Sequence, residues 1–213
     1  MAPNPFLTIW LSPRETIRRI VEWNPNYCVI WLACLAGVGQ AIDRSTMRDL
    51  GDKVPLAVLF TIVLIGGPLI GLLHLYISSL LLRWTGKWLG GTGSTRHLRT
   101  ALAWGCLPYV FCLPLDLVAW LIAGRELFTK ETPHLEAHPG LMIPFIVIGL
   151  MEVTLAIWSV EILCQTIAEV QGYRSAWCGF GNIMLSVLVP IAALLVLALI
   201  LVALIKGGAA LFH

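Results

Sequence analysis

Five long apolar stretches constrain this chain most, because every lysine and arginine lies in the segments between them. None of its 14 basic residues falls inside the stretches, which cover about 27–42, 56–82, 101–123, 141–167 and 182–205. A helix that crosses a bilayer needs roughly 20 apolar residues. Only 12% of the chain is charged, against about 25% in globular proteins. The sequence therefore predicts an all-α fold, a polytopic membrane bundle of five transmembrane helices.

The predicted spans define the domain organisation. We expect an N-terminal cytoplasmic segment over 1–26, a five-helix transmembrane domain over 27–205 and a short C-terminal tail over 206–213, with no soluble domain. Residues 1–26 are broken by prolines and charges and do not form a separate signal peptide.

An amphipathic helix is expected before the first span. Ser12 can cap it, Pro13 suits its first position, and Glu15 completes a capping box. Ile17 and Ile20 then share one face, with arginines mostly elsewhere. This pattern fits an interfacial helix on a membrane surface, or equally a helix packed against the bundle.

The basic residues also indicate an orientation. With five spans the termini lie on opposite sides, and the N-terminal side carries eight lysines and arginines against six on the other. The loop 83–100 holds four of the eight and no acid. By the positive-inside rule, the N-terminus is cytoplasmic and the C-terminus external, in the cell inner (plasma) membrane.

Small residues mark close helix contacts. Ala33, Gly37 and Ala41 repeat every four residues in the first span. Gly67 and Gly71 form GxxxG in the second, where Pro68 is expected to break or kink the helix. Either set is also a candidate homodimer contact.

Three acids lie inside the predicted spans without a lysine or arginine: Asp116, Glu152 and Glu161. A carboxylate at a helix centre costs about 2.5–3.5 kcal/mol, so such groups are protonated, paired or wet. Depth along the helices predicts two polar clusters, which are His74 with Glu161 and Gln165, and Asp116 with Glu152.

Three interpretations of these acids remain open: structural hydrogen bonding between helices, a proton or cation pathway, and metal binding. A continuous polar path joining His74 to Asp116 would favour transport, whereas a dry bundle would favour a structural role.

Outside the spans, two segments are weaker candidates. His134, Glu136 and His138 would point to one side of an extended chain, as zinc ligands or as part of a solvated turn. The glycine-rich loop before the third span could hold a lipid phosphate, or be a simple flexible turn. Its candidate contacts are Gly93, Ser94, Thr95, Arg96 and Arg99.

The order of features resembles the Yip1 family in its bacterial form. The likeness covers most of the chain and lies in three segments, "NPFLTIWLSPRETIRRIVEWNP" at 4–25, "LGGTGSTRHLRTALAWGCLPYV" at 89–110 and "IAEVQGYRSAWCGFGN" at 167–182. The resemblance implies a five-span membrane protein. The family's eukaryotic members are tied to vesicle trafficking and Rab-type GTPases, but their acidic DLYGP signature is absent here, so GTPase binding is not carried over.

No nucleophile–base arrangement or phosphate-binding motif indicates an enzyme, and no cofactor is expected. The net charge of +2 does not suggest nucleic acid. The six cysteines are expected to be reduced. The sequence thus predicts a membrane-organising protein that binds lipids or a protein partner of unknown identity; the alternative is a small proton- or cation-coupled transporter or channel.

Overall fold

The computed structural model describes residues 4–210, and side chains up to residue 200. All regular elements in this range are helical. They are α1 (Pro5–Thr8), α2 (Pro13–Trp23), α3 (Val29–Met47), α4 (Leu50–Lys53), α5 (Leu56–Thr61), the π-helix η1 (Ile62–Gly66), α6 (Gly67–Trp88), α7 (Thr95–Gly105), α8 (Leu107–Val110), α9 (Cys112–Ala123), the 3₁₀ helix η2 (Gly124–Phe128), α10 (Pro133–Ala137), η3 (Pro139–Leu141), α11 (Met142–Gln171) and α12 (Ala176–Ala210).

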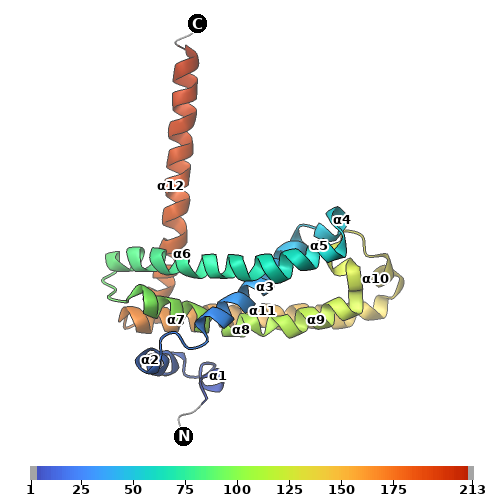
Figure 1. Ribbon diagram of the computed structural model, residues 1–213, viewed down its shortest axis with the longest axis horizontal. Helices are drawn as coiled ribbons and strands as arrows, with labels where there is room; N and C mark the ends of the chain where they lie inside the picture. Colours follow the sequence, from blue (N-terminus) through green and yellow to red (C-terminus); the bar gives the residue numbers. More distant parts are fainter. Residues whose placement is uncertain (1–3, 211–213) are drawn as a thin grey trace.

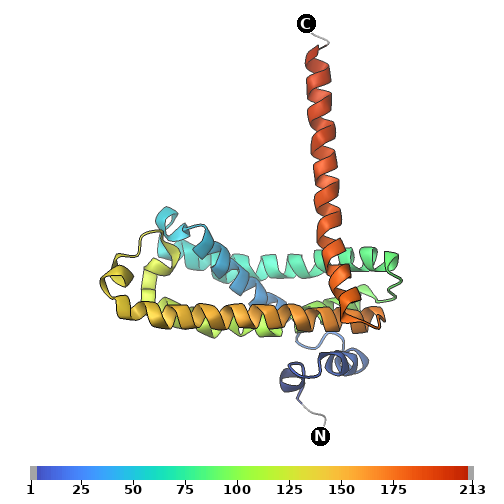
Figure 2. The same cartoon turned by 180° about the vertical axis from the view of Figure 1, so that it is seen from behind.

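The long helices α6 and α11 run along an elongated bundle, and α7, α8 and α9 follow one another along it (Figure 1). α3 crosses the bundle diagonally and packs mainly on α6, while α7 packs on both α6 and α11. The short helices α4 and α10 lie at one end of the bundle. α2 lies against α7 and α11 near the other end (Figure 2).

Within the described residues, four helical stretches are long and apolar enough to cross a membrane, not the five that the sequence predicts. They are Leu56–Trp88, Leu107–Phe128, Pro139–Gln171 and Ala176–Ile200. The helix expected as the first span does form, as α3, but its second half contains polar and charged residues such as Gln40, Asp43 and Arg44. These lower its hydropathy, so α3 is not among the four.

α3 and α6 meet through glycine, as the small-residue pattern predicts. A Cβ atom added at Gly37 would lie 2.1 Å from the carbonyl oxygen of Gly67, and one at Gly71 would lie 2.3 Å from that of Ala33. The two backbones therefore approach more closely than any side chain allows. These residues already pack α3 against α6 within one chain, so they are not available as the homodimer contact that the sequence suggests.

The second span is continuous rather than broken. α5, η1 and α6 follow without a gap, and the π-helix Ile62–Gly66 directly precedes Pro68. Proline has no N–H to donate, and a π-turn absorbs the resulting irregularity in the helical hydrogen bonds. The expected interruption is thus a local change of helix type.

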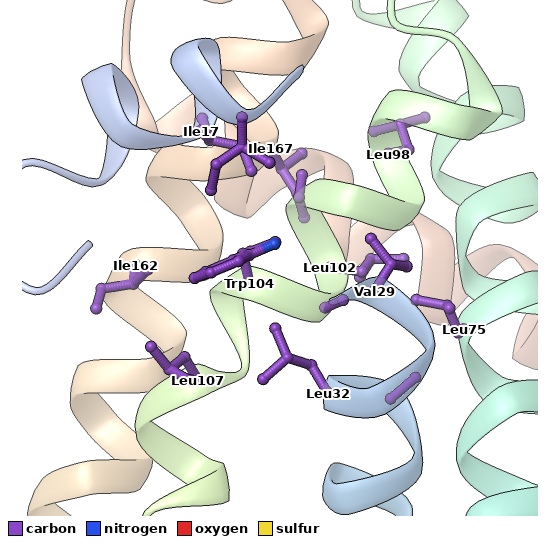
Figure 3. Packing of buried hydrophobic residues seen from close by; sticks show 14 of the residues in the cluster. Ile17, Val29, Leu32, Leu75, Leu98, Leu102, Trp104, Leu107, Ile162 and Ile167 are labelled. Carbon is purple, nitrogen blue, oxygen red and sulfur yellow. The ribbon is translucent and has the colours of Figure 1, made fainter. Parts of the chain in front are cut away.

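The main hydrophobic core surrounds Trp104, which is fully buried (Figure 3). Its indole Nε1 donates to the carbonyl of Tyr27 at 3.0 Å, so its one polar atom is satisfied. The ring centroids of Phe6 and Tyr27 lie 4.8 and 5.9 Å from the ring centroid of Trp104. This core joins the N-terminal helices to α3, α7 and α11.

α12 rises from the bundle across the direction of α6 and α11 (Figure 1). Its first turns pack on α11 and α6, where Gly179, Asn182 and Ser186 are buried. Residues 191–200 are all exposed. Because spanning helices tilt at most about 40° from the membrane normal, α12 must change its orientation if it crosses the same flat bilayer as α6. Its helix reaches Ala210, within the expected tail; residues 211–213 of that tail, like residues 1–3, lie outside the described part.

We predict that Gly71→Ala destabilises the protein by about 1–3 kcal/mol, because the added methyl group meets the α3 backbone. Gly66→Ala is the matched control in the same span, since its Cβ would meet nothing closer than 3.9 Å. Thermal unfolding in detergent measures both. Equal stability of the two variants would contradict the close backbone contact.

Candidate functional site

Three carboxylates from three helices line one cavity of about 350 Å³. They are Asp43 of α3, Asp116 of α9 and Glu152 of α11. The sequence predicts Asp116 and Glu152 as one cluster, and the structure places both on this cavity. Asp43 was missed because it lies just beyond the predicted first span. The carboxylates were expected to be buried, and this expectation is wrong: Asp116 and Glu152 are half-buried, Asp43 is exposed, and no acidic residue in the described range is buried.

Tyr109 fixes one of these carboxylates. Its hydroxyl donates to Asp43 Oδ2 at 2.6 Å. Its ring packs against Gly39, where an added Cβ would lie 3.2 Å from it. The tyrosine therefore ties α8 to the end of α3 beside the carboxylate cavity.

The second predicted cluster is not assembled. Glu161 is exposed and accepts a hydrogen bond from Gln165 one turn along α11. His74 lies instead on a cavity of about 30 Å³ with Gln40 and Cys106. The position of a residue along its helix gives its depth in the bundle but not the direction in which its side chain points. His74 lies on α6 and Glu161 on α11, and α7 packs against both of these helices.

The glycine-rich loop is held by a buried glutamine that the sequence analysis missed. Gln171 Oε1 accepts from the Gly93 N–H at 3.0 Å, and Nε2 donates to the Leu82 carbonyl at 3.1 Å. Added Cβ atoms at Gly91 and Gly93 would come within 2.6 and 2.8 Å of Gln171 Oε1. The glycines therefore allow the loop to fold onto the end of α11.

The predicted lipid-phosphate residues have partners of their own within the fold. Ser94 caps α7 by accepting from the His97 N–H at 3.2 Å, and Thr95 begins the helix. Arg96 donates to Asn26, and Arg99 lies over the Tyr76 ring at 4.8 Å. The Gly93 N–H is already bound to Gln171 and is not free to bind a phosphate. Phosphate binding by this loop remains a prediction, in which Arg96 and Arg99 are the candidate contacts.

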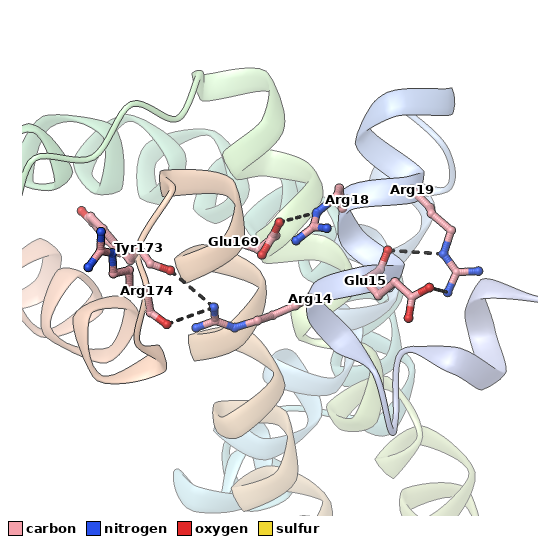
Figure 4. Close-up of polar contacts among 7 residues, drawn as sticks. All are labelled: Arg14, Glu15, Arg18, Arg19, Glu169, Tyr173 and Arg174. Carbon is pink, nitrogen blue, oxygen red and sulfur yellow. Dashed lines mark hydrogen bonds and ion pairs between the residues drawn. The ribbon is translucent and has the colours of Figure 1, made fainter.

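The N-terminal helix α2 forms where its start signals predict, and its apolar face is buried against the bundle. Arg18 Nε binds Glu169 Oε1 at 2.6 Å, and Arg14 donates to the carbonyls of Tyr173 and Arg174 (Figure 4). The hydrogen bond and negative charge of Glu169 raise the pKa of Arg18. α2 is thus bound to the end of α11 and the turn that follows it.

Tyr173 joins the same end to α6. Its hydroxyl donates to the Gly86 carbonyl at 3.1 Å, and burial raises the pKa of this hydroxyl. Nearby, Thr85 donates to Asn182 of α12 at 2.8 Å. α6, the loop, α11 and α12 are therefore linked by buried polar contacts.

The alternating histidines do not form the expected zinc geometry. Pro133–Ala137 is a helix, not an extended strand, so His134, Glu136 and His138 do not all share one side, although the rings of the two histidines lie one helical turn apart with their centroids at 4.8 Å. The Glu126 carboxylate accepts from the N–H groups of His134 and Leu135. Within the described residues no group of three or more potential ligands could hold a metal ion.

The long apolar helices and the helical bundle define a multi-pass membrane protein. The Yip1 domain model matches residues 7–211, which is nearly the whole chain. The chain belongs to the Yip1 family, as the resemblance of its sequence segments predicts. Among curated proteins and among solved structures, no match is found.

We predict that Gln171→Met destabilises the protein by about 1–3 kcal/mol, since the Gly93 N–H and the Leu82 carbonyl lose their partner in a buried site. Gln165→Met is the control, because that side chain is half-buried and bonds to the exposed Glu161. Chemical unfolding in detergent compares them. A Gln171 variant as stable as the control would mean that the glutamine does not hold the loop.

Proposed function

We propose that this protein is a non-enzymatic organiser of the inner membrane that gathers anionic lipids at the cytoplasmic end of its helix bundle. The observation that carries the proposal is the unequal distribution of charge between the two ends of the bundle. The family match supports a membrane role of the Yip1 type but does not specify a ligand.

One end is strongly basic. α2, the end of α6, the start of α7 and the end of α11 meet there through the contacts of Arg18, Gln171 and Tyr173. These elements and the adjoining turn carry Arg14, Arg18, Arg19, Arg83, Lys87, Arg96, Arg99 and Arg174, with Glu15, Glu22 and Glu169 as the acids. This end of the bundle therefore carries eight cations and three carboxylates.

The opposite end is close to neutral. α4 and η2 meet there, where Arg125 donates to the Gly51 carbonyl and the Lys130 N–H to Asp52. The charged residues of this end are Asp43, Arg44, Arg48, Asp49, Asp52, Lys53, Arg125, Glu126, Lys130, Glu131 and Glu136. Five cations are balanced by six acids.

Two independent effects follow from this asymmetry. Positive charge favours retention of the basic end in the cytoplasm. Each lysine or arginine near an anionic leaflet contributes about 1 kcal/mol of attraction. Arg96 and Arg99 at the start of α7 are part of this surface, which agrees with the lipid-phosphate role predicted for them.

Transport is the weaker alternative. The carboxylate cavity offers a polar site, but the small cavity beside His74 shares no lining residue with it. The continuous polar path that transport requires is therefore not supported by these two cavities. Under the present proposal, Asp116→Asn combined with Glu152→Gln leaves ion and proton flux in liposomes unchanged; carboxylate-dependent flux would instead favour the transporter.

We further propose that α3 crosses the membrane with the four longer helices, which places the C-terminus outside. α3 has 19 residues, so at about 1.5 Å per residue it nearly matches a hydrocarbon core of about 30 Å. α12 then reorients to lie along the bundle.

A C-terminal fusion tests this topology. Alkaline phosphatase fused after His213 is expected to be active and a fluorescent-protein fusion dark, because the external side allows disulfide formation. An N-terminal fluorescent-protein fusion is the control and is expected to be bright. The reverse C-terminal result would mean an even number of crossings, without α3.

The lipid proposal is tested at two exposed cation pairs. Changing Arg83 and Lys87 to glutamine should reduce enrichment of phosphatidylglycerol over phosphatidylcholine in purified complexes, by roughly fivefold per charge. Arg44 and Arg48 at the neutral end, changed in the same way, are the matched control and should have little effect. Lipid mass spectrometry measures both, and equal losses would contradict a lipid-binding basic end.

A further inference from the structure

A cavity of about 300 Å³ lies between the two N-terminal helices, apart from the carboxylate cavity and from the basic loop. Pro5 and Thr8 of α1 form one wall, and Thr16, Ile20 and Trp23 of α2 form the other. Tyr27, just after α2, completes the lining. The volume is at the lower end of the range for small-molecule sites, about 300–1,000 Å³. It holds part of a lipid, not a whole one.

The interior of this cavity is suited to hydrocarbon. The Thr16 hydroxyl, which is 2% exposed, donates to the Thr8 hydroxyl at 2.9 Å. The two threonines thus satisfy each other and require no polar group from a ligand. The other interior walls are aliphatic and aromatic, so burying an apolar chain there costs no hydrogen bond.

The surroundings of the cavity are apolar and exposed. Leu7 on α1 is 72% exposed, Leu11 in the turn between α1 and α2 is 85% exposed, and Trp23 on the cavity wall is 71% exposed. On a membrane protein such a surface faces lipid, and tryptophan favours the interfacial level of the bilayer. The cavity is therefore within reach of lipid acyl chains.

Arg19 supplies a cation to the same cavity. Arg14 and Arg18 bind the end of α11 and its turn, whereas Arg19 also lines the space between the helices. Figure 4 shows Arg19 on the side of α2 away from Glu169. It pairs with Glu15 at 3.3 Å, and that carboxylate is mostly solvated. A guanidinium has five N–H donors, so Arg19 can bind a phosphate while keeping Glu15.

We infer that the space between α1 and α2 holds one acyl chain of an anionic phospholipid whose phosphate binds Arg19. The inference rests on the proposed function and deepens it, by assigning one specific lipid site beside the general attraction of the basic end. An apolar cavity with a single cation matches a phospholipid, which joins a hydrocarbon chain to a phosphate.

Photocrosslinking in liposomes tests the site. Phosphatidylglycerol that carries a diazirine on one acyl chain is expected to label the peptide containing residues 5–27. Thr8→Phe fills the cavity and should abolish that label, whereas Thr8→Val keeps the volume without the hydroxyl and should retain it. Labelling elsewhere only, or equal labelling of the two variants, would overturn the inference; a Thr8→Phe protein that melts at the wild-type temperature shows that folding is not the cause.

A second arm tests the phosphate. Arg19→Gln should lower the preference of this label for phosphatidylglycerol over a phosphatidylcholine probe by roughly fivefold, as expected for one solvent-accessible ionic contact. An unchanged preference would overturn the assignment of the phosphate to Arg19. The Arg83 and Lys87 variant separates the two proposals, because it should reduce total lipid enrichment without moving the label from residues 5–27.

Discussion

The close contact between the backbones of α3 and α6 determines much of the remaining structure. Lipid tails are as apolar as leucine, so membrane helices associate by van der Waals packing rather than by a hydrophobic driving force. Gly37, Gly67 and Gly71 permit this packing by removing every side chain from the contact. On another side of α3, Gly39 makes room for Tyr109, which binds Asp43. Two glycines of α3 therefore have different roles: Gly37 allows α3 to pack on α6, and Gly39 allows α3 to pack on Tyr109 beside the carboxylate cavity.

The basic end depends on a different kind of contact. Gln171 and Tyr173 there bond to backbone groups, which avoids the cost of an unsatisfied polar group in a low-dielectric site, whereas the side-chain nitrogen of Asn182 is buried without a partner among the described residues. Gln171 joins α11 to the loop and to α6, while Asn182 joins the start of α12 to Thr85. This network holds together α6, the loop, α11 and the start of α12 at the end where the cations gather. The side chains that we connect with lipid therefore lie on elements that are bonded to one another.

Sequence patterns predicted the features that depend on local periodicity. The Ala33–Gly37 contact and the family follow from spacing and motif, and both are confirmed. A helix begins at Pro13 as expected, but Ser12 makes no side-chain capping hydrogen bond, and the interfacial position of this helix stays a prediction. The clustering of Asp116 with Glu152 was predicted from their depth and from the helical rotation that separates Glu152 from Glu161, and both residues line one cavity. Depth failed for His74 and Glu161, because the direction of a side chain around its helix depends on which helices are neighbours.

Other features could not be predicted because they require tertiary context. Gln171 reads as an ordinary polar residue at a helix end, and only the folded loop shows its two backbone partners. The zinc hypothesis assumed an extended chain at His134, whereas Pro133 begins a short helix. The span count differed at α3, because the second half of this helix contains Gln40, Asp43 and Arg44 and is too polar to count as a membrane span by composition.

The carboxylates and the cations have a common consequence even if no ion moves. Asp116 and Glu152 share a cavity with Asp43 towards the neutral end, so they add two acids to that end, whereas the cations gather at the other end, where we propose that they attract anionic headgroups. Under the lipid role that we propose, a bundle polarised in this way interacts unequally with the two leaflets. The lipid sorting that we propose requires no continuous channel, and the cavities beside His74 and Asp116 share no lining residue.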